Sequence, residues 1–305
     1  MDVRKRVLVA SALLLPSLAS AADSTPRLIA KIHVGAAPCA GVAAFGSFWQ
    51  TTYASSTLSR VNPRTNKVTR TGRLGFSPCG IAAGAGSIWI DGYGTARVER
   101  VNPKTLRVVK RIRVGINVWD VAYAFGSVWA TNNADGSVSR IDPATNRIVK
   151  TIKTGPKPSN FGIGKDAIWV GSNGPTEQDV YRIDPATNTS RRVPTGHDRP
   201  SGIVVSADAV WTANRDDTVS RLDPATNSAI AVVRVGVRPQ QGAEARDGTI
   251  WIPNQTANTI SVIDPASNSV VSTVKTGRGP FVVRAGFGDM WVGSFGGTDL
   301  WRIRP

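Results

Sequence analysis

The feature that most constrains this chain is a sequence pattern that returns about every forty residues. One copy is "VSRIDPATNRIVKTIKTG", from Val138 to Gly155. A tryptophan and an Asn-Pro or Asp-Pro step recur with the same spacing, so two independent markers share one register. A fixed period of this length is typical of propellers and solenoids, in which each repeat is one supersecondary unit. The repeated tryptophans are Trp49, Trp89, Trp129, Trp169, Trp211, Trp251 and Trp291.

Each repeat has the pattern of four short strands separated by turns. In the second copy the strands are "CGIAAG", "IWIDGY", "ARVERVNP" and "LRVVKRIRVG". The first is small and apolar and suits a crowded centre, and the third alternates with period two. Cations at alternate positions of the fourth strand suit a solvent-facing edge. We therefore predict an all-β fold, a seven-bladed β-propeller with four-stranded blades of about 40 residues.

The last copy of the repeat contains "LWRIRP" but no outer strand. The missing strand is found near the other end of the chain, where "PRLIAKIHVG", Pro26 to Gly35, aligns with "LRVVKRIRVG". We therefore expect the N-terminal strand to complete the last blade and to close the ring by hydrogen bonds.

The first residues have the pattern of a secretory signal peptide. A basic start, "MDVRKR", precedes the apolar run "VLVASALLLPSLA" and the small-residue site "ASA" that ends at Ala21. We expect residues 1–21 to be the signal peptide and residues 22–305 to form the propeller. The protein would then be periplasmic or secreted. No further apolar run is long enough to span a membrane, and we expect a monomer.

The formal net charge of +16 favours anionic partners, such as a small molecule, a glycan or another exported protein. We expect no nucleic acid, because most cations fall on predicted outer strands without interleaved aromatic residues. Cys39 and Cys79 lie one repeat apart on equivalent inner strands, and export permits a disulfide between them. Their spacing fits neither a zinc site nor a haem-attachment motif.

The segment "WIPNQTANTISVIDPASNSVVSTVKTG", Trp251 to Gly277, resembles the YVTN-type β-propeller repeat. The pattern is shared with the streptogramin B (virginiamycin B) lyase family, seven-bladed propellers that use a metal to open a cyclic depsipeptide antibiotic. That family places a histidine directly after the loop proline and acidic residues just past the repeated tryptophan. Here no histidine follows a loop proline, and Asp91 is the one acidic residue just past a repeated tryptophan. The resemblance therefore does not extend to the residues on which the lyase activity depends.

The loops between each outer strand and the next inner strand should lie at one mouth of the central channel. Their charge varies from copy to copy although the scaffold does not require it, and convergent cations there could hold a carboxylate, sulfate or phosphate. Aromatic and amide side chains in the same loops would add stacking and hydrogen bonds. The alternative is that these are solvated loop residues on a protein that is basic everywhere. The candidates in these loops are Trp119, Asp120, Lys157, His197, Arg199, Arg238, Gln240, Arg278 and Phe281.

A second candidate set lies two or three residues past each tryptophan, from which we take Asn214 and Asn254 as ligand-binding candidates. Glu244 and Arg284 hold one inner-strand position in neighbouring blades, where we expect an ion pair between them.

These observations predict an exported binding or interaction scaffold that recognises an anionic small molecule, a glycan or a protein at the channel mouth. We expect no cofactor and no resident metal. The alternative is a lyase-like enzyme for C–O elimination, which would use His197 with Asp91 or Asp120 and a divalent metal.

Overall fold

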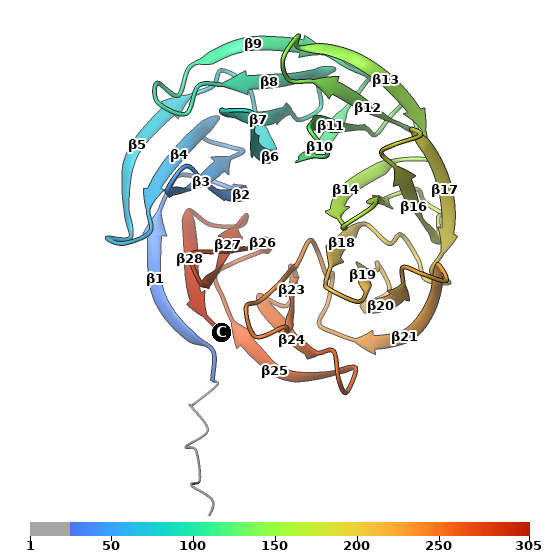
Figure 1. The fold of residues 1–305 in the computed structure, drawn as a ribbon. Coiled ribbons are helices and arrows are strands. Elements are labelled where there is room, and N and C mark those ends of the chain that lie inside the picture. Colours follow the sequence, from blue (N-terminus) through green and yellow to red (C-terminus); the bar gives the residue numbers. More distant parts are fainter. Residues whose placement is uncertain (1–24) are drawn as a thin grey trace, which may run out of the picture.

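The computed structural model describes residues 25–305, which form seven four-stranded antiparallel sheets arranged as the blades of a ring (Figure 1). The described part contains strands and turns but no helix, so the predicted seven-bladed β-propeller is confirmed. The predicted signal peptide, residues 1–21, lies outside the described residues. Among residues 25–305 there is no long apolar helix of the kind that crosses a membrane.

Within each blade the strands follow one another from the channel to the outer rim. Blade 1 contains β2 (Pro38–Ala44), β3 (Ser47–Thr52), β4 (Thr57–Asn62) and β5 (Lys67–Arg73). Blade 2 contains β6 (Pro78–Gly84), β7 (Ser87–Gly92), β8 (Arg97–Val101) and β9 (Val108–Arg113). Blade 3 contains β10 (Val118–Ala124), β11 (Ser127–Asn132), β12 (Ser137–Asp142) and β13 (Arg147–Lys153). Blade 4 contains β14 (Pro158–Ile163), β15 (Ile168–Ser172), β16 (Asp179–Asp184) and β17 (Thr189–Pro194).

The remaining blades follow the same order. Blade 5 contains β18 (Gly202–Val205), β19 (Val210–Ala213), β20 (Thr218–Asp223) and β21 (Ser228–Arg234). Blade 6 contains β22 (Ala243–Glu244), β23 (Ile250–Asn254), β24 (Thr259–Asp264) and β25 (Ser269–Lys275). Blade 7 contains β26 (Pro280–Gly286), β27 (Asp289–Ser294), β28 (Asp299–Arg304) and β1 (Arg27–His33).

The N-terminal strand β1 closes the ring, as the repeat alignment predicts. It pairs antiparallel with β28, from Arg27 opposite Arg304 to His33 opposite Asp299. In Figure 1 the blue β1 therefore lies directly beside the red end of the chain. Closure gives the last blade its fourth strand and covers the outer edge of β28.

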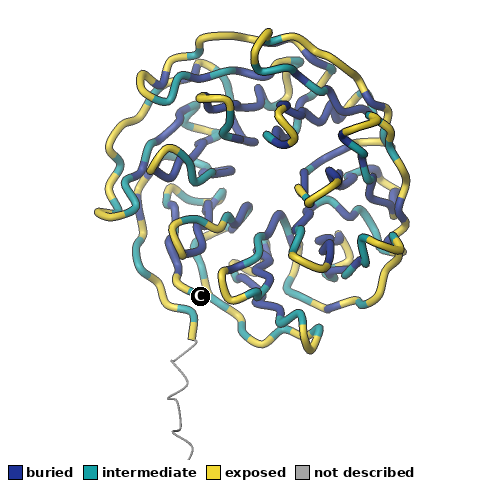
Figure 2. Tube along the Cα trace, in the orientation of Figure 1, coloured by how far each residue is buried: buried dark blue, intermediate teal, exposed yellow. Residues whose placement is uncertain are grey.

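The repeated tryptophans form the core between blades. Trp89 is fully buried and packs with Val118, Val128 and other apolar residues of the next blade. Its indole N–H donates to the carbonyl of Gly84, 3.0 Å away, so burial leaves no polar atom unpaired. The inner strands are mostly buried and the outer circumference is exposed (Figure 2). The period of forty therefore reflects one large apolar anchor at each blade interface.

A second contact explains why an arginine precedes the Asn-Pro or Asp-Pro step. The Arg140 guanidinium lies over Trp129 and donates to the carbonyl of Pro185 and to Asn188 Oδ1 of the next blade, at 2.6 and 2.8 Å. Arg302 of blade 7 makes the same contacts to Pro63 and Asn66 of blade 1, which closes the ring a second time. These charge-assisted bonds fasten adjacent blades on the face opposite the loop prolines.

Candidate functional site

A cavity of about 550 Å³ opens at the mouth of the channel where the proline-containing loops converge. Most of its lining comes from two positions per blade. One is the stretch around the loop proline, and the other is the residue four positions after each repeated tryptophan. All seven residues at the second position line the cavity, namely Tyr53, Tyr93, Asn133, Asn173, Arg215, Gln255 and Phe295.

The structure brings most of the predicted loop candidates to this cavity. They come from blades 3 to 7 and include cations, an acid, an amide and two aromatic rings. The candidates that line the cavity are Trp119, Asp120, Lys157, Arg199, Arg238, Gln240 and Phe281.

Asn214 and Asn254 do not line the cavity. Both are buried inside their blades, where the Asn254 amide donates to the hydroxyls of Thr259 and Ser261 at 3.0 and 2.9 Å. The amide of Asn214 contacts the equivalent hydroxyls of blade 5. These asparagines hold the second and third strands together. The residue one position later, which the sequence reasoning missed, faces the mouth.

His197 and Arg278 also lie outside the lining of the cavity. His197 Nδ1 lies 2.7 Å from Asp216 Oδ2 on the loop surface, and Arg278 is exposed. Among the cations of the proline-containing loops, those that reach the cavity stand directly before the proline, whereas Arg278 is separated from Pro280 by Gly279. Position relative to the proline therefore decides which loop cation faces the mouth.

The cationic side of the cavity is formed by blades 4 to 6. Lys157, Arg199 and Arg238 each precede a loop proline and share a left-handed backbone, with φ of 52°, 46° and 60°. Arg215, which is four positions after Trp211, also lines this side of the cavity. Burial, and then the nearby charge of Arg215, lower the pKa of Arg238. Cations crowded in this way favour an anion between them.

The opposite side of the cavity is a continuous row of five aromatic rings from blades 3, 2, 1 and 7. We call it the aromatic arc. Neighbouring ring centroids are separated by 5.2, 5.5, 5.8 and 5.2 Å, within the range for favourable aromatic pairs. In order around the mouth the rings are Trp119, Tyr93, Tyr53, Phe295 and Phe281.

Asp120 and Arg284 lie deeper in the channel and also line the cavity. Burial raises the pKa of Asp120, while the Arg284 charge and the backbone N–H groups of Phe161 and Val121 oppose that rise. Burial likewise lowers the pKa of Arg284, and Asp120 opposes it. The predicted ion pair between Glu244 and Arg284 is wrong, because within residues 25–305 no such contact forms and Asp120 is the charge that faces Arg284.

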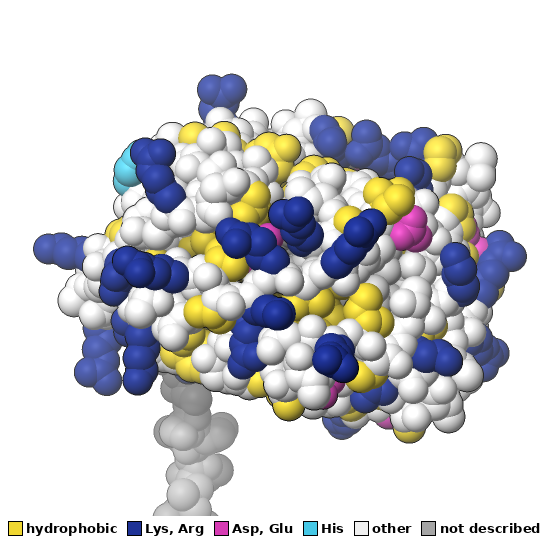
Figure 3. All heavy atoms as spheres, turned by 90° about the horizontal axis from the view of Figure 1, so that it is seen from above, with side chains coloured by type: hydrophobic (Ala, Val, Ile, Leu, Met, Phe, Trp, Pro, Cys, Tyr) yellow, Lys and Arg dark blue, Asp and Glu magenta, His cyan; other side chains and the backbone are white. Residues whose placement is uncertain are grey.

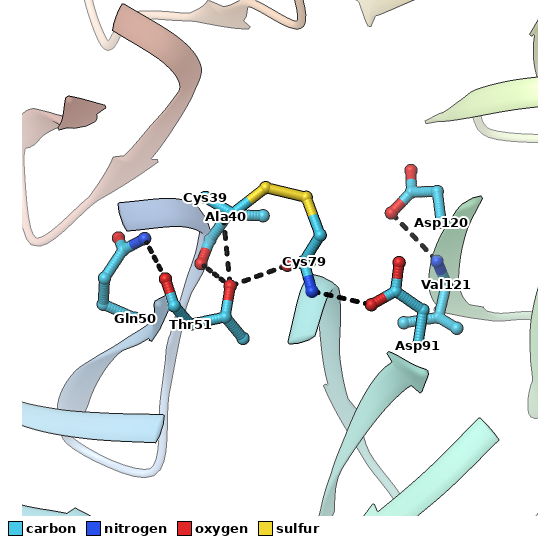
Figure 4. Close-up of a disulfide and its surroundings, with 8 residues drawn as sticks. All are labelled: Cys39, Ala40, Gln50, Thr51, Cys79, Asp91, Asp120 and Val121. Atoms are coloured by element: carbon cyan, nitrogen blue, oxygen red, sulfur yellow. Dashed lines mark hydrogen bonds between the residues drawn. A yellow bond between two sulfur atoms is a disulfide. The ribbon is translucent and has the colours of Figure 1, made fainter. Parts of the chain in front are cut away.

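Asp91 lies beside Asp120 and is fully buried (Figure 4). Its Oδ1 accepts the backbone N–H of Cys79 at 2.8 Å, whereas Oδ2 has no hydrogen-bond partner among the described residues. Burial raises the pKa of Asp91 well above its usual range, and Asp120 adds to the rise. The two carboxylates meet at Gly80, where a Cβ would approach Asp120 Oδ1 to 2.6 Å and Asp91 Oδ2 to 3.1 Å.

Cys39 and Cys79 are joined by a disulfide at the edge of the same region (Figure 4). The bond links the inner strands β2 and β6 of adjacent blades, with the two Cα atoms 5.1 Å apart. Cys79 also lines the cavity. The disulfide therefore fixes blades 1 and 2 where they carry Tyr53 and Tyr93.

The residues present do not fit the divalent metal that a lyase relative would use. Across residues 25–305, no three His, Cys, Asp or Glu side chains gather around a point that could hold a metal ion. His197 is committed to Asp216 on the loop surface, away from Asp91 and Asp120. Both buried carboxylates are instead bonded to backbone N–H groups.

Comparisons with known proteins agree with this architecture. Residues 79–176 match a sequence profile described as a repeat of unknown function (DUF6923). No curated protein matches the sequence. Among solved structures, a catalytically inactive histidine-to-alanine variant of virginiamycin B lyase from Staphylococcus aureus with Quinupristin is 17% identical, with a TM-score of 0.78. The match covers 92% of this chain and 100% of that one.

A second similar structure is the hydrazine synthase of Kuenenia stuttgartiensis. It is 14% identical with a TM-score of 0.76, over 89% of this chain and 96% of that one. The likeness is one of fold. Propellers with unrelated activities match equally well, so the chain is a distant relative of the lyase propellers in architecture, and function has to be argued from the cavity.

Proposed function

We propose that this protein is a binding protein for a small anionic ligand that carries a flat apolar face, such as an aromatic ring or a sugar ring. The observation that carries the proposal is the division of one cavity into two halves. Blades 4 to 6 present Lys157, Arg199, Arg215 and Arg238, and blades 7, 1, 2 and 3 present the aromatic arc.

The size of the cavity suits such a ligand. Its volume of about 550 Å³ falls within the range of small-molecule sites, which combine apolar walls with a few convergent polar groups. The anionic group would lie against Arg199 and Arg238, and the ring would stack on the opposite wall. Arginine suits the first task because its planar fork matches a carboxylate, sulfonate or phosphate. A ligand with both parts would thus have one preferred orientation.

Binding is favoured over lyase chemistry by what lines the cavity. Elimination needs a base within reach of the proton that leaves, and His197 is paired with Asp216 outside the lining. Asp120 is bonded to the backbone N–H groups of Val121 and Phe161 and faces Arg284, which suits a structural charge better than a free base. An exported location, periplasmic or secreted, is part of the proposal and follows from the signal-peptide pattern of residues 1–21.

Fluorescence titration with two dyes tests the proposal. 8-Anilinonaphthalene-1-sulfonate has a ring system and an anion, and N-phenyl-1-naphthylamine has the rings without the sulfonate. We expect the wild type to bind the sulfonate more tightly. Replacing Arg199 and Arg238 by Gln should remove about 1.5–3 kcal/mol per charge-assisted bond for the sulfonate and leave the neutral dye nearly unchanged.

The control variant replaces Arg113 and Lys153, which are exposed on the outer rim, by Gln. This pair carries the same charge far from the cavity. The proposal fails if both double variants weaken sulfonate binding equally, because the effect would then be general charge attraction. It also fails if the wild type does not distinguish the two dyes.

A further inference from the structure

The outer strands of blades 1 to 4 carry a dense array of exposed cations that the channel mouth does not use. On β5, β9, β13 and β17 the cations are exposed and no Asp or Glu is present. We call this surface the basic rim. Its cations are Lys67, Arg70, Arg73, Lys110, Arg111, Arg113, Arg147, Lys150, Lys153, Arg191 and Arg192.

Few of these cations are neutralised by the protein itself. Within the described chain, Arg111 pairs with Glu99 at 3.4 Å and Arg192 pairs with Asp179, and no other cation of the basic rim lies in an ion pair. In Figure 3, which views the ring from the side of β9, Lys and Arg side chains spread over the surface and Asp and Glu side chains are few. The surface therefore has a strong positive potential with little internal compensation.

The fold does not require this charge. Outer strands β21 and β25 occupy the same place in blades 5 and 6, yet each contains a single cation. There, Ala231 and Ser272 hold the register position at which blades 1 to 4 have Arg70, Lys110, Lys150 and Arg191. Protection of an outer edge by charge is thus dispensable in this ring, and it does not account for the concentration of cations on four consecutive blades.

The shape and composition of the basic rim indicate the class of its partner. The four strands follow one another around the convex circumference (Figure 1), so a flat bilayer could touch one or two of them while a flexible chain could follow them all. The four strands contain no aromatic residue. Recognition of single-stranded nucleic acid relies on stacking of bases on aromatic rings, which this surface does not offer.

We propose that the basic rim binds an acidic polysaccharide, a flexible chain of sugars with carboxylate or sulfate groups. Binding would be electrostatic, would tolerate variation in sugar sequence and would release counterions, as for other polyanions. The proposal is independent of the channel mouth, because none of the cations of the basic rim lines the cavity.

The test measures binding of the full chain to polygalacturonate and to dextran sulfate, with neutral dextran as reference, at several salt concentrations. A quadruple variant replaces Lys110, Arg113, Arg147 and Lys150 by Gln. These four side chains are exposed and make no ion pair within residues 25–305. We expect at least about a tenfold loss of affinity and a shallower dependence on salt, since up to four counterion-releasing contacts are removed.

The matched control replaces Arg64, Lys104, Lys165 and Arg246 by Gln. These residues are also exposed, lie on turns and remove the same charge. The proposal is overturned if this variant loses as much affinity as the rim variant, or if the wild type does not bind either polyanion. It is also overturned if vesicles of phosphatidylglycerol or a single-stranded DNA oligomer bind the wild type more tightly than the polysaccharides do. Equal melting temperatures of the three proteins establish that both variants are folded.

Discussion

Asn254 and Gln255 are neighbours in sequence, but their side chains lie on opposite sides, one inside the blade and the other in the cavity. The Asn254 amide is buried in blade 6, where it donates to Thr259 and Ser261. Gln255 turns away from the blade and lines the cavity, where its Oε1 accepts a hydrogen bond from Gln240 at 3.3 Å. The same division recurs around the ring. The third position after each tryptophan is buried in its blade, and the fourth faces the mouth.

Removing rings from the aromatic arc should weaken binding of the apolar part of a ligand. We expect replacement of Tyr53 and Phe295 by Ala to reduce the affinity for N-phenyl-1-naphthylamine by about 0.5–1.5 kcal/mol per ring, because each ring loses a stacking partner. Fluorescence titration measures the change. The control is Val271→Ala, which removes an exposed apolar side chain of the outer rim and should have no effect. Unchanged affinity of the double variant would mean that the arc is not the apolar wall of the site.

The fold could be predicted from the sequence because the pattern of one blade recurs seven times. Trp89 and its equivalents are anchors that every blade needs, so their spacing identifies the blades without ambiguity. Closure by β1 was equally predictable, since "PRLIAKIHVG" completes the one copy that lacks an outer strand.

The candidate site was predictable only in part. Residues beside the loop prolines, such as Trp119 and Arg238, could be found because they depart from the repeat. The other rings of the aromatic arc, Tyr53, Tyr93 and Phe295, were missed because side chains alternate between two directions along a strand. A choice that is wrong by one residue therefore selects a side chain inside the blade instead of one that faces the cavity. The signal that could have found it is the variety at that position, where Tyr93, Asn133 and Arg215 stand at equivalent sites.

The arginine that joins neighbouring blades should contribute to stability. Arg140→Gln removes charge-assisted bonds to Pro185 and Asn188, and we expect the free energy of unfolding to fall by about 1.5–3 kcal/mol. Urea denaturation measures the difference. Arg182→Gln is the matched control, because Arg182 pairs with the exposed Asp166 of its own blade. An equal loss in both variants would show that the interblade bonds add nothing.

The buried carboxyl of Asp91 should make stability depend on pH. Because burial raises the pKa of Asp91 in the folded protein, the folded state binds more protons than the unfolded state above about pH 4, and the free energy of unfolding falls as pH rises. Asp91→Asn removes this titration and places an amide nitrogen beside Asp120. We expect the variant to lose less stability than the wild type between about pH 4 and 7. Thermal unfolding across this range is the measurement.

The exposed Asp166 provides the control for Asp91→Asn, since Asp166→Asn removes one negative charge without altering the channel. Identical pH profiles for the wild type and the Asp91 variant would refute the assignment of a raised pKa to that carboxyl.

The disulfide between Cys39 and Cys79 should leave no free thiol. Titration of the unfolded, unreduced protein is expected to detect none, and two thiols after reduction. Because the bond closes a loop of 40 residues, its loss in a Cys39→Ala and Cys79→Ala double variant should cost about 2–4 kcal/mol of unfolding free energy. Two reactive thiols before reduction would contradict the bond.

A crystal structure of the complex with 8-anilinonaphthalene-1-sulfonate would show directly whether the cavity holds an anion on one side and a ring on the other. We expect the sulfonate to lie within about 3.5 Å of the Arg199 or Arg238 guanidinium, and the naphthalene ring to lie against Tyr53, Tyr93 or Trp119. A dye bound on the outer rim, or bound in the cavity with its sulfonate against the aromatic arc, would contradict it.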